Sequence, residues 1–219
     1  RHAGGDSSNV QDKLKGVQQI QATDAAFAAI LDDGSVITWG DWHYGGDSSA
    51  VQDQLKSVRQ LQATCNAFVA ILADGSVVSW GSRRFGGNTA EVQDQLRSVQ
   101  QVQVTHANHC AFAAILADGS VVTWGNKPAG GDAYAVQDRL RSVQQIQATQ
   151  SSFAAILADG SVVTWGDKKA GGDSSDVEDK LKGVQQIQAT HGAFAAILAD
   201  GSVVTWGDKK AGGDSSDVE

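Results

Sequence analysis

The feature that most restricts the fold is a short unit that recurs along the whole chain. It occupies residues 27–40, 68–81, 112–125, 153–166 and 194–207, and the last three copies all read FAAILADGSVVTWG. Each copy joins an apolar run to a second run rich in β-branched residues through Asp-Gly, and it closes with Trp-Gly. Asp-Gly accepts the positive φ angles of a tight turn between twisted strands. Each copy therefore predicts a β-hairpin.

The spacing of these units predicts a repeat architecture. The Trp-Gly pairs begin at residues 39, 80, 124, 165 and 206, so successive copies lie 41, 44, 41 and 41 residues apart. A period near 40 is typical of small sheets stacked into a propeller or a solenoid. Both ends of the sequence fall inside a repeat, so we expect a segment of a longer chain, with residues 1–219 forming one repeat domain.

The part of each unit before the hairpin predicts a short helical turn. In the last complete unit, Val177, Leu181 and Val184 lie at the spacing of one apolar helical face. Ser175 precedes Glu178 by three residues, which is typical of a capping box. We expect a short helix or a single helical turn here, with the serine and the glutamate capping its first turn.

The strands of one unit cannot all be covered within that unit. Residues 185–190 alternate glutamine with Ile187 and Ala189, which predicts a strand with one solvated face. The two hairpin strands that follow are apolar on both faces, so both faces must be covered. Stacking of one unit on the next supplies that cover. We therefore expect an all-β fold: a closed or partial β-propeller of five repeats, each a β-meander with a short helical turn.

Composition excludes several classes of function. The formal net charge is −8, so the chain lacks the basic surface of a nucleic-acid-binding protein. Asp-Gly interrupts every apolar run well short of the roughly 20 residues that cross a bilayer, so we expect no transmembrane segment. Cys65 and Cys110 occupy corresponding loops of neighbouring repeats, which allows one bridge. We expect two free thiols and an intracellular location, in the cytosol or inside an organelle.

The repeat also carries a family resemblance. Residues 111–125 and 193–207 read AFAAILADGSVVTWG, preceded by an expected strand and followed by a glycine-rich turn. This pattern resembles the repeat of the regulator of chromosome condensation family and covers essentially the whole chain. The resemblance implies a β-propeller, usually seven-bladed, with four-stranded blades. The unit here is shorter than the family's usual repeat, and the histidine that often precedes the apolar strand is mostly absent.

The same unit is similar to short tandem repeats in many algal proteins labelled ubiquitin ligases, but these residues contain no ligase domain. The plant ultraviolet-B photoreceptor shares the repeat too. Its Gly-Trp-Arg-His-Thr motif is missing here, and five of the six tryptophans stand in the Trp-Gly position. We therefore expect those five to be buried packing residues and only Trp42, which is not repeated, to be exposed. Light sensing is not expected.

Neither a metal site nor a catalytic site is expected. His106, His109 and Cys110 are three possible zinc ligands, but a structural zinc site takes four. We interpret them as part of a polar loop insertion. The repeated Gly-Gly-Asp is interpreted as turn chemistry rather than a calcium site. Near-identical copies do not provide the single special environment that a nucleophile or an acid–base pair needs. We therefore expect a protein that is not an enzyme and has no cofactor.

The copies differ mainly in two segments, one after the threonine that precedes the hairpin and one after Trp-Gly. In an antiparallel meander these connections lie at the same end, where rigid scaffolds usually carry function. Relaxed constraint on surface loops explains the differences equally well. Aromatic residues and arginine are typical of interface hot spots. The candidate partner-binding residues are Trp42, His43, Tyr44, Arg83, Arg84, Phe85, His106, His109 and Lys127.

Three functions remain open. The first is a non-catalytic protein–protein interaction scaffold that presents its variable loops to a protein partner within a larger complex. The second is a structural accessory subunit of a large assembly, including a membrane-associated one. The third is a regulatory domain of a ubiquitin ligase or an exchange factor whose catalytic part lies elsewhere. If the ring does not close, its first and last sheets expose apolar faces, which include Phe27, Ala29 and Leu31 at one end, Val204 and Trp206 at the other, or the opposite faces.

Overall fold

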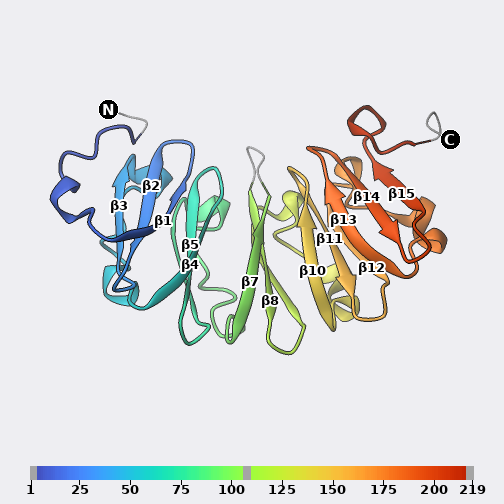
Figure 1. Ribbon diagram of the computed structural model, residues 1–219, viewed down its shortest axis with the longest axis horizontal. Coiled ribbons are helices and arrows are strands. Elements are labelled where there is room, and N and C mark those ends of the chain that lie inside the picture. The colour runs from blue at the N-terminus through green and yellow to red at the C-terminus, as the bar shows by residue number, and fades with distance from the viewer. Residues whose placement is uncertain (1–3, 106–109, 216–219) are drawn as a thin grey trace. The chain divides into compact units, whose positions relative to one another are not determined.

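The computed structural model describes residues 4–105 and 110–215, and the strands form five three-stranded antiparallel sheets (Figure 1). In every sheet the strand order follows the sequence, so each sheet is a simple meander. The sheets comprise β1 (Val17–Ala22), β2 (Ala26–Leu31) and β3 (Val36–Gly40); β4 (Val58–Ala63), β5 (Ala67–Leu72) and β6 (Val77–Gly81); β7 (Val99–Val104), β8 (Ala111–Leu116) and β9 (Val121–Gly125); β10 (Val143–Ala148), β11 (Ser152–Leu157) and β12 (Val162–Gly166); β13 (Val184–Ala189), β14 (Ala193–Leu198) and β15 (Val203–Gly207). The all-β propeller architecture is confirmed, although each blade has three strands where the family resemblance implied four.

By its contacts the chain divides into two compact units, Arg1–Gln100 and Gln101–Glu219, and each is described by itself. The expectation of one repeat domain over residues 1–219 stays a prediction. Short 3-10 helices lie between consecutive sheets, before β1 and after β15. They are η1 (Gln11–Lys13), η2 (Trp42–Tyr44), η3 (Gln52–Gln54), η4 (Arg83–Phe85), η5 (Lys127–Ala129), η6 (Tyr134–Arg139), η7 (Lys168–Ala170), η8 (Ser175–Lys180) and η9 (Lys209–Ala211).

The five hairpin units form as the Asp-Gly turns predict. In the third repeat, Oδ1 of Asp118 accepts hydrogen bonds from the backbone amide and the hydroxyl of Ser120, at 2.9 and 2.6 Å. These bonds favour the charged carboxylate and lower the pKa of Asp118. Gly119 has φ +78°, a left-handed conformation that glycine adopts without the steric cost of a side chain. The turn is therefore specified by three consecutive residues.

The predicted helical turn is present, but the predicted capping box is wrong. In the last complete repeat the turn is the 3-10 helix η8, and its N-cap residue Ser174 makes no side-chain cap bond. The glutamine at the position of Glu178 bonds instead to the preceding strand, because a strand carbonyl lies within its reach in the folded repeat. Gln52, Gln93 and Gln137 donate through Nε2 to the carbonyl oxygens of Val36, Val77 and Val121, at 3.0, 3.1 and 2.9 Å.

Each blade has a stacked aromatic pair between its two hairpin strands, near the end away from the Asp-Gly turn. The rings of Phe153 and Trp165 stack with centroids 5.2 Å apart, and Trp165 Nε1 donates to the carbonyl of Gly130 at 3.1 Å. A Cβ on Gly130 would lie 2.6 Å from the Phe153 ring, so this position of the Gly-Gly turn has to be glycine. Burial of the Trp-Gly tryptophans is confirmed for Trp80, Trp124, Trp165 and Trp206, each 4% exposed. Trp39 is only half-buried.

Consecutive blades pack face to face, as the two-sided apolar strands predict. Between the fourth and fifth repeats, Ala154, Ile156 and Val162 pack in one cluster with residues of the next blade that include Leu181, Val184 and Ile187. The amide of Val184 donates to the carbonyl of Gly160 at 2.9 Å. The first unit contains the same arrangement, in which Val58 donates to Gly34 at 2.9 Å. One set of contacts therefore joins one repeat to the next in both units.

Both cysteines, Cys65 and Cys110, are disulfide-bonded, so the expectation of two free thiols is wrong. The expectation rested on the small number of cysteines, which argues against a disulfide framework but not against a bridge. Within each unit, equivalent loops of consecutive repeats lie close together. Asp24 N donates to the carbonyl of Cys65 at 3.0 Å, and Gln150 N donates to that of His191 at 3.0 Å. Structural disulfides are typical of oxidising compartments, so the expected intracellular location loses the free-thiol argument on which it was based.

Candidate functional site

Within a blade, the two variable segments lie beside each other. The hydroxyl of Thr23, just before β2, donates to the carbonyl of Tyr44 at 3.0 Å. Thr149 and Thr190 make the same bond to Ala170 and Ala211, at 3.1 and 2.8 Å. In these three repeats the threonine therefore ties the loop that precedes the hairpin to the loop that follows it. The variable residues of such a blade gather at one end of its sheet.

The loop after the first Trp-Gly presents an aromatic surface. It forms η2, whose N-cap residue Asp41 accepts a hydrogen bond from the His43 amide at 2.9 Å and lies 3.1 Å from His43 Nδ1. The His43 ring packs on the Trp42 ring with centroids 3.5 Å apart. Trp42 is 67% exposed, which confirms the prediction for this residue. Tyr44 instead packs against the apolar core of the first unit, so its contribution is largely structural.

The equivalent loop of the second repeat adds positive charge beside this surface. It forms η4, in which the Arg84 guanidinium lies over the Phe85 ring, 5.6 Å from its centroid. Arg83 and Arg84 are exposed, and Phe85 is half-buried. Arginine over an aromatic face is held by a cation–π attraction, which is weak when the pair is exposed. The loop therefore directs two guanidinium groups outward, with Arg84 partly held by its neighbour.

Two depressions beside these loops share the lining residues Trp42, Gly81 and Arg83, and we call them together the Trp42 hollow. One part has a volume of about 590 Å³ and is lined by Trp42, His43, Tyr44, Asn66, Gly81, Ser82 and Arg83. A second part, also of about 590 Å³, shares Trp42, Gly81 and Arg83 and extends over Trp80 to Asp47 and Asn88. All of these residues belong to the first unit. The hollow therefore combines an exposed indole with a guanidinium.

The charges around the Trp42 hollow differ from those of the later repeats. In the later repeats a lysine after Trp-Gly forms an ion pair with the aspartate five positions on. These pairs are Lys127–Asp132, Lys168–Asp173 and Lys209–Asp214, with N–O distances of 3.7, 3.3 and 3.1 Å. In the first repeat Trp42 replaces the lysine, and in the second Asn88 replaces the aspartate opposite Arg83. None of the ion pairs between described residues includes Arg83.

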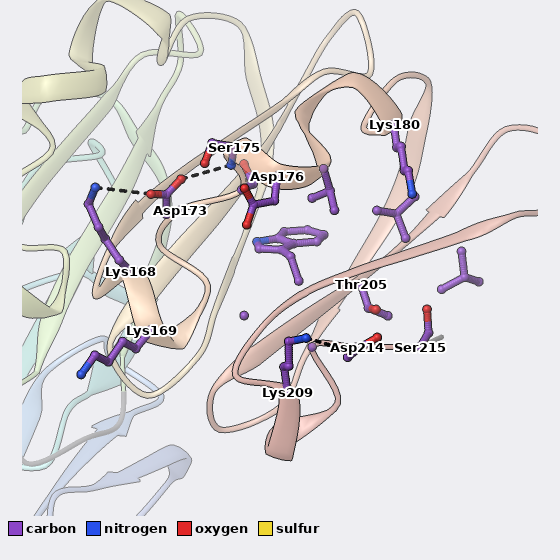
Figure 2. Close-up of a pocket in the computed structure, with 17 residues that line it drawn as sticks. Lys168, Lys169, Asp173, Ser175, Asp176, Lys180, Thr205, Lys209, Asp214 and Ser215 are labelled. Atoms are coloured by element: carbon purple, nitrogen blue, oxygen red, sulfur yellow. Dashed lines mark hydrogen bonds and ion pairs between the residues drawn. The ribbon is translucent and has the colours of Figure 1, made fainter. Parts of the chain in front are cut away.

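The equivalent pocket of the fifth repeat shows this contrast (Figure 2). It has a volume of about 570 Å³ over Trp206, with the Lys168–Asp173 pair on one side and the Lys209–Asp214 pair on another. Asp173 also accepts hydrogen bonds from Ser175, which with Lys168 lower its pKa. Lys169 and Lys180 also line this pocket and form no ion pair among the described residues. At the position equivalent to Arg83, however, Lys168 and Lys209 are paired with carboxylates of their own chain, whereas Arg83 can pair with a carboxylate from another molecule.

The structure brings together four of the nine predicted site residues. Trp42, His43, Tyr44 and Arg83 line the Trp42 hollow. Arg84 and Phe85 follow Arg83 in the same loop but do not line the hollow. Lys127 belongs to the second unit and pairs with Asp132. His106 and His109 lie outside the described residues.

Sequence reasoning missed several polar residues that line the Trp42 hollow, among them Asp47, Asn66 and Ser79. Asp47 was interpreted only as a turn residue, and its pKa is indeed lowered by hydrogen bonds from Ser49. Ser79 Oγ is buried without a hydrogen-bond partner. Its counterpart Thr164 Oγ1 lies 3.1 Å from Ser174 Oγ. An alignment of the repeats shows that Trp42 replaces the lysine of the pair in the first repeat and Asn88 replaces the aspartate in the second. That difference would have indicated this part of the hollow from the sequence alone.

No cluster of three metal-ligating side chains occurs in residues 4–105 and 110–215. Because His106 and His109 fall in the gap between those ranges, the expectation of no zinc there stays a prediction. The same part of the chain contains no helix that is both long and apolar enough to cross a bilayer.

The fold is that of the regulator of chromosome condensation (RCC1-like) repeat proteins. Human WBSCR16 is 19% identical, with a TM-score of 0.53, over 90% of this chain and 63% of that one. Prp20p from Saccharomyces cerevisiae, studied for its binding to Gsp1p and histones, is 18% identical, with a TM-score of 0.54, over 91% and 59%. Yeast RCC1 (Prp20) bound to Kap60 is 18% identical, with a TM-score of 0.54, over 91% and 57%.

The chain thus spans 57–63% of the length of these three solved structures. No protein-family model matches the chain, and no curated protein matches it. At these identities the likeness establishes the repeat fold. It confirms the family resemblance of the sequence at the level of architecture.

Proposed function

We propose that this chain is a non-catalytic interaction scaffold and that the Trp42 hollow is its protein-binding site. The observation that carries the proposal is the exposure of Trp42 beside an arginine without an ion pair, in a repeat position where later copies place a closed lysine–aspartate pair. Trp and Arg are enriched among residues that dominate binding energy. The fold supports the proposal as well, since the solved structures of yeast RCC1 (Prp20) include a complex with Kap60.

The chemistry of the hollow defines the kind of partner that it fits. The indole of Trp42 contacts apolar groups, and the guanidinium of Arg83 can form a bidentate pair with a carboxylate. We therefore expect a protein segment that presents an apolar or aromatic side chain close to an Asp or Glu. In the pocket over Trp206, the lysines that correspond to Trp42 and Arg83 are already paired with Asp173 and Asp214, so that pocket offers such a segment neither an exposed indole nor an unpaired cation at these positions.

The test is selection of peptides from a random displayed library on the 219-residue protein. We expect enriched peptides to combine an acidic residue with an apolar one. Truncation of a hot-spot residue typically costs 2 kcal/mol or more, so Trp42→Ala is expected to weaken binding about 30-fold. Arg83→Glu is expected to weaken binding further, because it places a carboxylate opposite the acidic residue of the peptide.

Lys168→Glu is the matched control, since it reverses a cation at the position of Arg83 in a repeat whose lysine is already paired. It should leave the affinity of the selected peptides unchanged. Peptides that bind Trp42→Ala and Arg83→Glu as tightly as the unaltered protein would show that the hollow is not the binding site.

A further inference from the structure

The part of the Trp42 hollow that extends over Trp80 contains two opposite charges that no ion pair closes. Asp47 and Arg83 are the charged residues among the described residues that line it, and both are exposed. Neither belongs to any of the ion pairs between described residues. The hollow therefore presents one unpaired carboxylate and one unpaired guanidinium to solvent.

Each charge is left unpaired by a single replacement after Trp-Gly. In the first repeat Trp42 stands where the later repeats have the lysine of the pair, so Asp47 has no cation in its own loop. In the second repeat Asn88 stands where the later repeats have the aspartate, so Arg83 has no carboxylate in its own loop. Two consecutive loops thus retain one half of the pair each, and both halves line the same depression.

The pocket over Trp206 shows the same four positions with both pairs closed (Figure 2). Its lining includes the Lys168–Asp173 pair at 3.3 Å and the Lys209–Asp214 pair at 3.1 Å. Each of these charges is balanced within its own loop. The Trp42 hollow has one positive and one negative residue at the equivalent positions, and each of them needs a partner from another molecule.

The replacement by asparagine preserves the turn and removes only the charge. Asn88 Oδ1 accepts a hydrogen bond from the Ala90 amide at 3.0 Å, just as Asp47 Oδ1 accepts one from the Ser49 amide at 2.9 Å. The side-chain amide of asparagine also has two N–H donors, which an aspartate lacks. Arg83 and Asn88 therefore both offer donors in this depression, and a carboxylate is the group that accepts hydrogen bonds from both.

Asp47 and Trp42 favour a group of the opposite charge. Hydrogen bonds from Ser49 lower the pKa of Asp47, so its carboxylate is ionised at neutral pH. The face of an indole attracts ammonium and guanidinium groups through its quadrupole, and Trp42 is exposed in the same depression. A basic side chain that enters the hollow therefore meets both a carboxylate and an aromatic face.

We propose that the Trp42 hollow binds a partner segment that carries both a basic and an acidic side chain. The basic side chain contacts Trp42 and Asp47, and the acidic one contacts Arg83 and Asn88. Charge complementarity identifies this occupant, because a purely acidic segment is repelled by Asp47 and a purely basic one by Arg83. The inference rests on the proposed function, since it specifies the partner of the same hollow.

The experiment uses the peptides selected from the displayed library on the 219-residue protein, in double-mutant cycles measured by isothermal titration calorimetry. We expect these peptides to carry a lysine or arginine as well as an acidic residue. Each peptide is also synthesised with its basic residue or its acidic residue changed to glutamine. Asp47→Asn and Arg83→Gln are each expected to weaken binding about 5-fold, in the upper range for a partly exposed ion pair.

The decisive result is the pattern of coupling. Asp47→Asn should have no further effect on peptides that lack the basic residue, and Arg83→Gln no further effect on peptides that lack the acidic one. Asn88→Asp supplies the carboxylate that later repeats have at this position, so it should pair with Arg83 and also weaken binding about 5-fold. Asp173→Asn is the matched control, because it removes the equivalent charge from the fourth repeat, and it should leave the affinity unchanged.

The two possible failures are distinguishable. Peptides that are weakened by Trp42→Ala but lack a basic residue, or that bind Asp47→Asn as tightly as the unaltered protein, would overturn this inference and leave the proposed function standing. Peptides that are indifferent to Trp42→Ala would overturn both. Circular dichroism melting checks that each variant is folded, and the peptide variants test both charges without altering the protein at all.

Discussion

A tryptophan of this chain is either a packing residue or an exposed residue, depending on whether it belongs to a Trp-Gly pair. A tryptophan followed by glycine stacks on the phenylalanine of its own hairpin and donates to a Gly-Gly turn, as Trp165 does with Phe153 and Gly130. Trp42 follows the Trp-Gly pair, belongs to a loop and is exposed. The role of each indole is therefore set by its place in the repeat.

We predict that Trp165→Ala lowers the free energy of unfolding by about 3–5 kcal/mol, because it removes a buried ring and leaves a cavity. Trp42→Ala should change it by no more than about 0.5 kcal/mol, as is usual for exposed positions. Denaturant titration of both variants measures the difference. A loss below about 1 kcal/mol for Trp165→Ala would contradict a core role for this residue.

The hairpin turn requires glycine for two separate reasons, its backbone conformation and the close approach of the next repeat. Gly160 and Gly201 both have left-handed φ, +78° and +83°, so any other residue is strained at either position. Only Gly160 also lies against the next repeat, where the approach to Gly183 leaves no room for a Cβ. The two glycines therefore separate the conformational requirement from the packing requirement.

We predict that Gly201→Ala costs about 1–2 kcal/mol, which is the cost of a left-handed alanine. Gly160→Ala should cost at least about 1 kcal/mol more, because it also forces the fourth and fifth repeats apart. Urea unfolding at low protein concentration gives both values. Equal losses would show that the contact at Gly183 has little energetic weight.

The hairpins were predictable from sequence because Asp-Gly, the β-branched run and Trp-Gly act within a few residues of each other. The role of Gln137 was not, because its acceptor, the carbonyl of Val121, becomes available only after the repeat has folded. The disulfide-bonded state of Cys65 and Cys110 was missed because the number of cysteines in a sequence does not show whether they are oxidised. In the candidate site, the loops were predicted, but the contrast between Arg83 and the paired lysines required the measured ion pairs.

Across the whole molecule, the turn aspartates form a common set of acid-sensitive groups. Each accepts hydrogen bonds from a serine two positions on, and these bonds lower its pKa. The set comprises Asp6, Asp33, Asp47, Asp74, Asp118, Asp159, Asp173 and Asp200. A carboxylate with a lowered pKa in the folded state stabilises that state when it is ionised. The hydrogen bonds of all these turns are therefore lost over the same range of acidic pH.

We predict that this contribution is fully present above the unfolded-state pKa of about 3.9 and is lost as the pH falls through the lower folded-state values. The free energy of unfolding should therefore decrease below about pH 4. Replacing Ser35, Ser76, Ser120, Ser161 and Ser202 with alanine removes the hydroxyl bonds and should make the decrease less steep. Urea unfolding at several pH values checks this, and an unchanged slope would contradict it.

The uniform hydrogen bond from a valine amide to the turn glycine of the previous repeat has a consequence for how such a chain can change over generations. Since every junction uses the same donor, the same acceptor and nearly the same apolar residues, duplication or deletion of one whole repeat leaves compatible partners at the new junction. Recombination between copies would then alter the number of blades in single steps without a new interface having to arise. A change in the number of repeats is therefore compatible with the fold, and selection can act on the loops of each added blade independently.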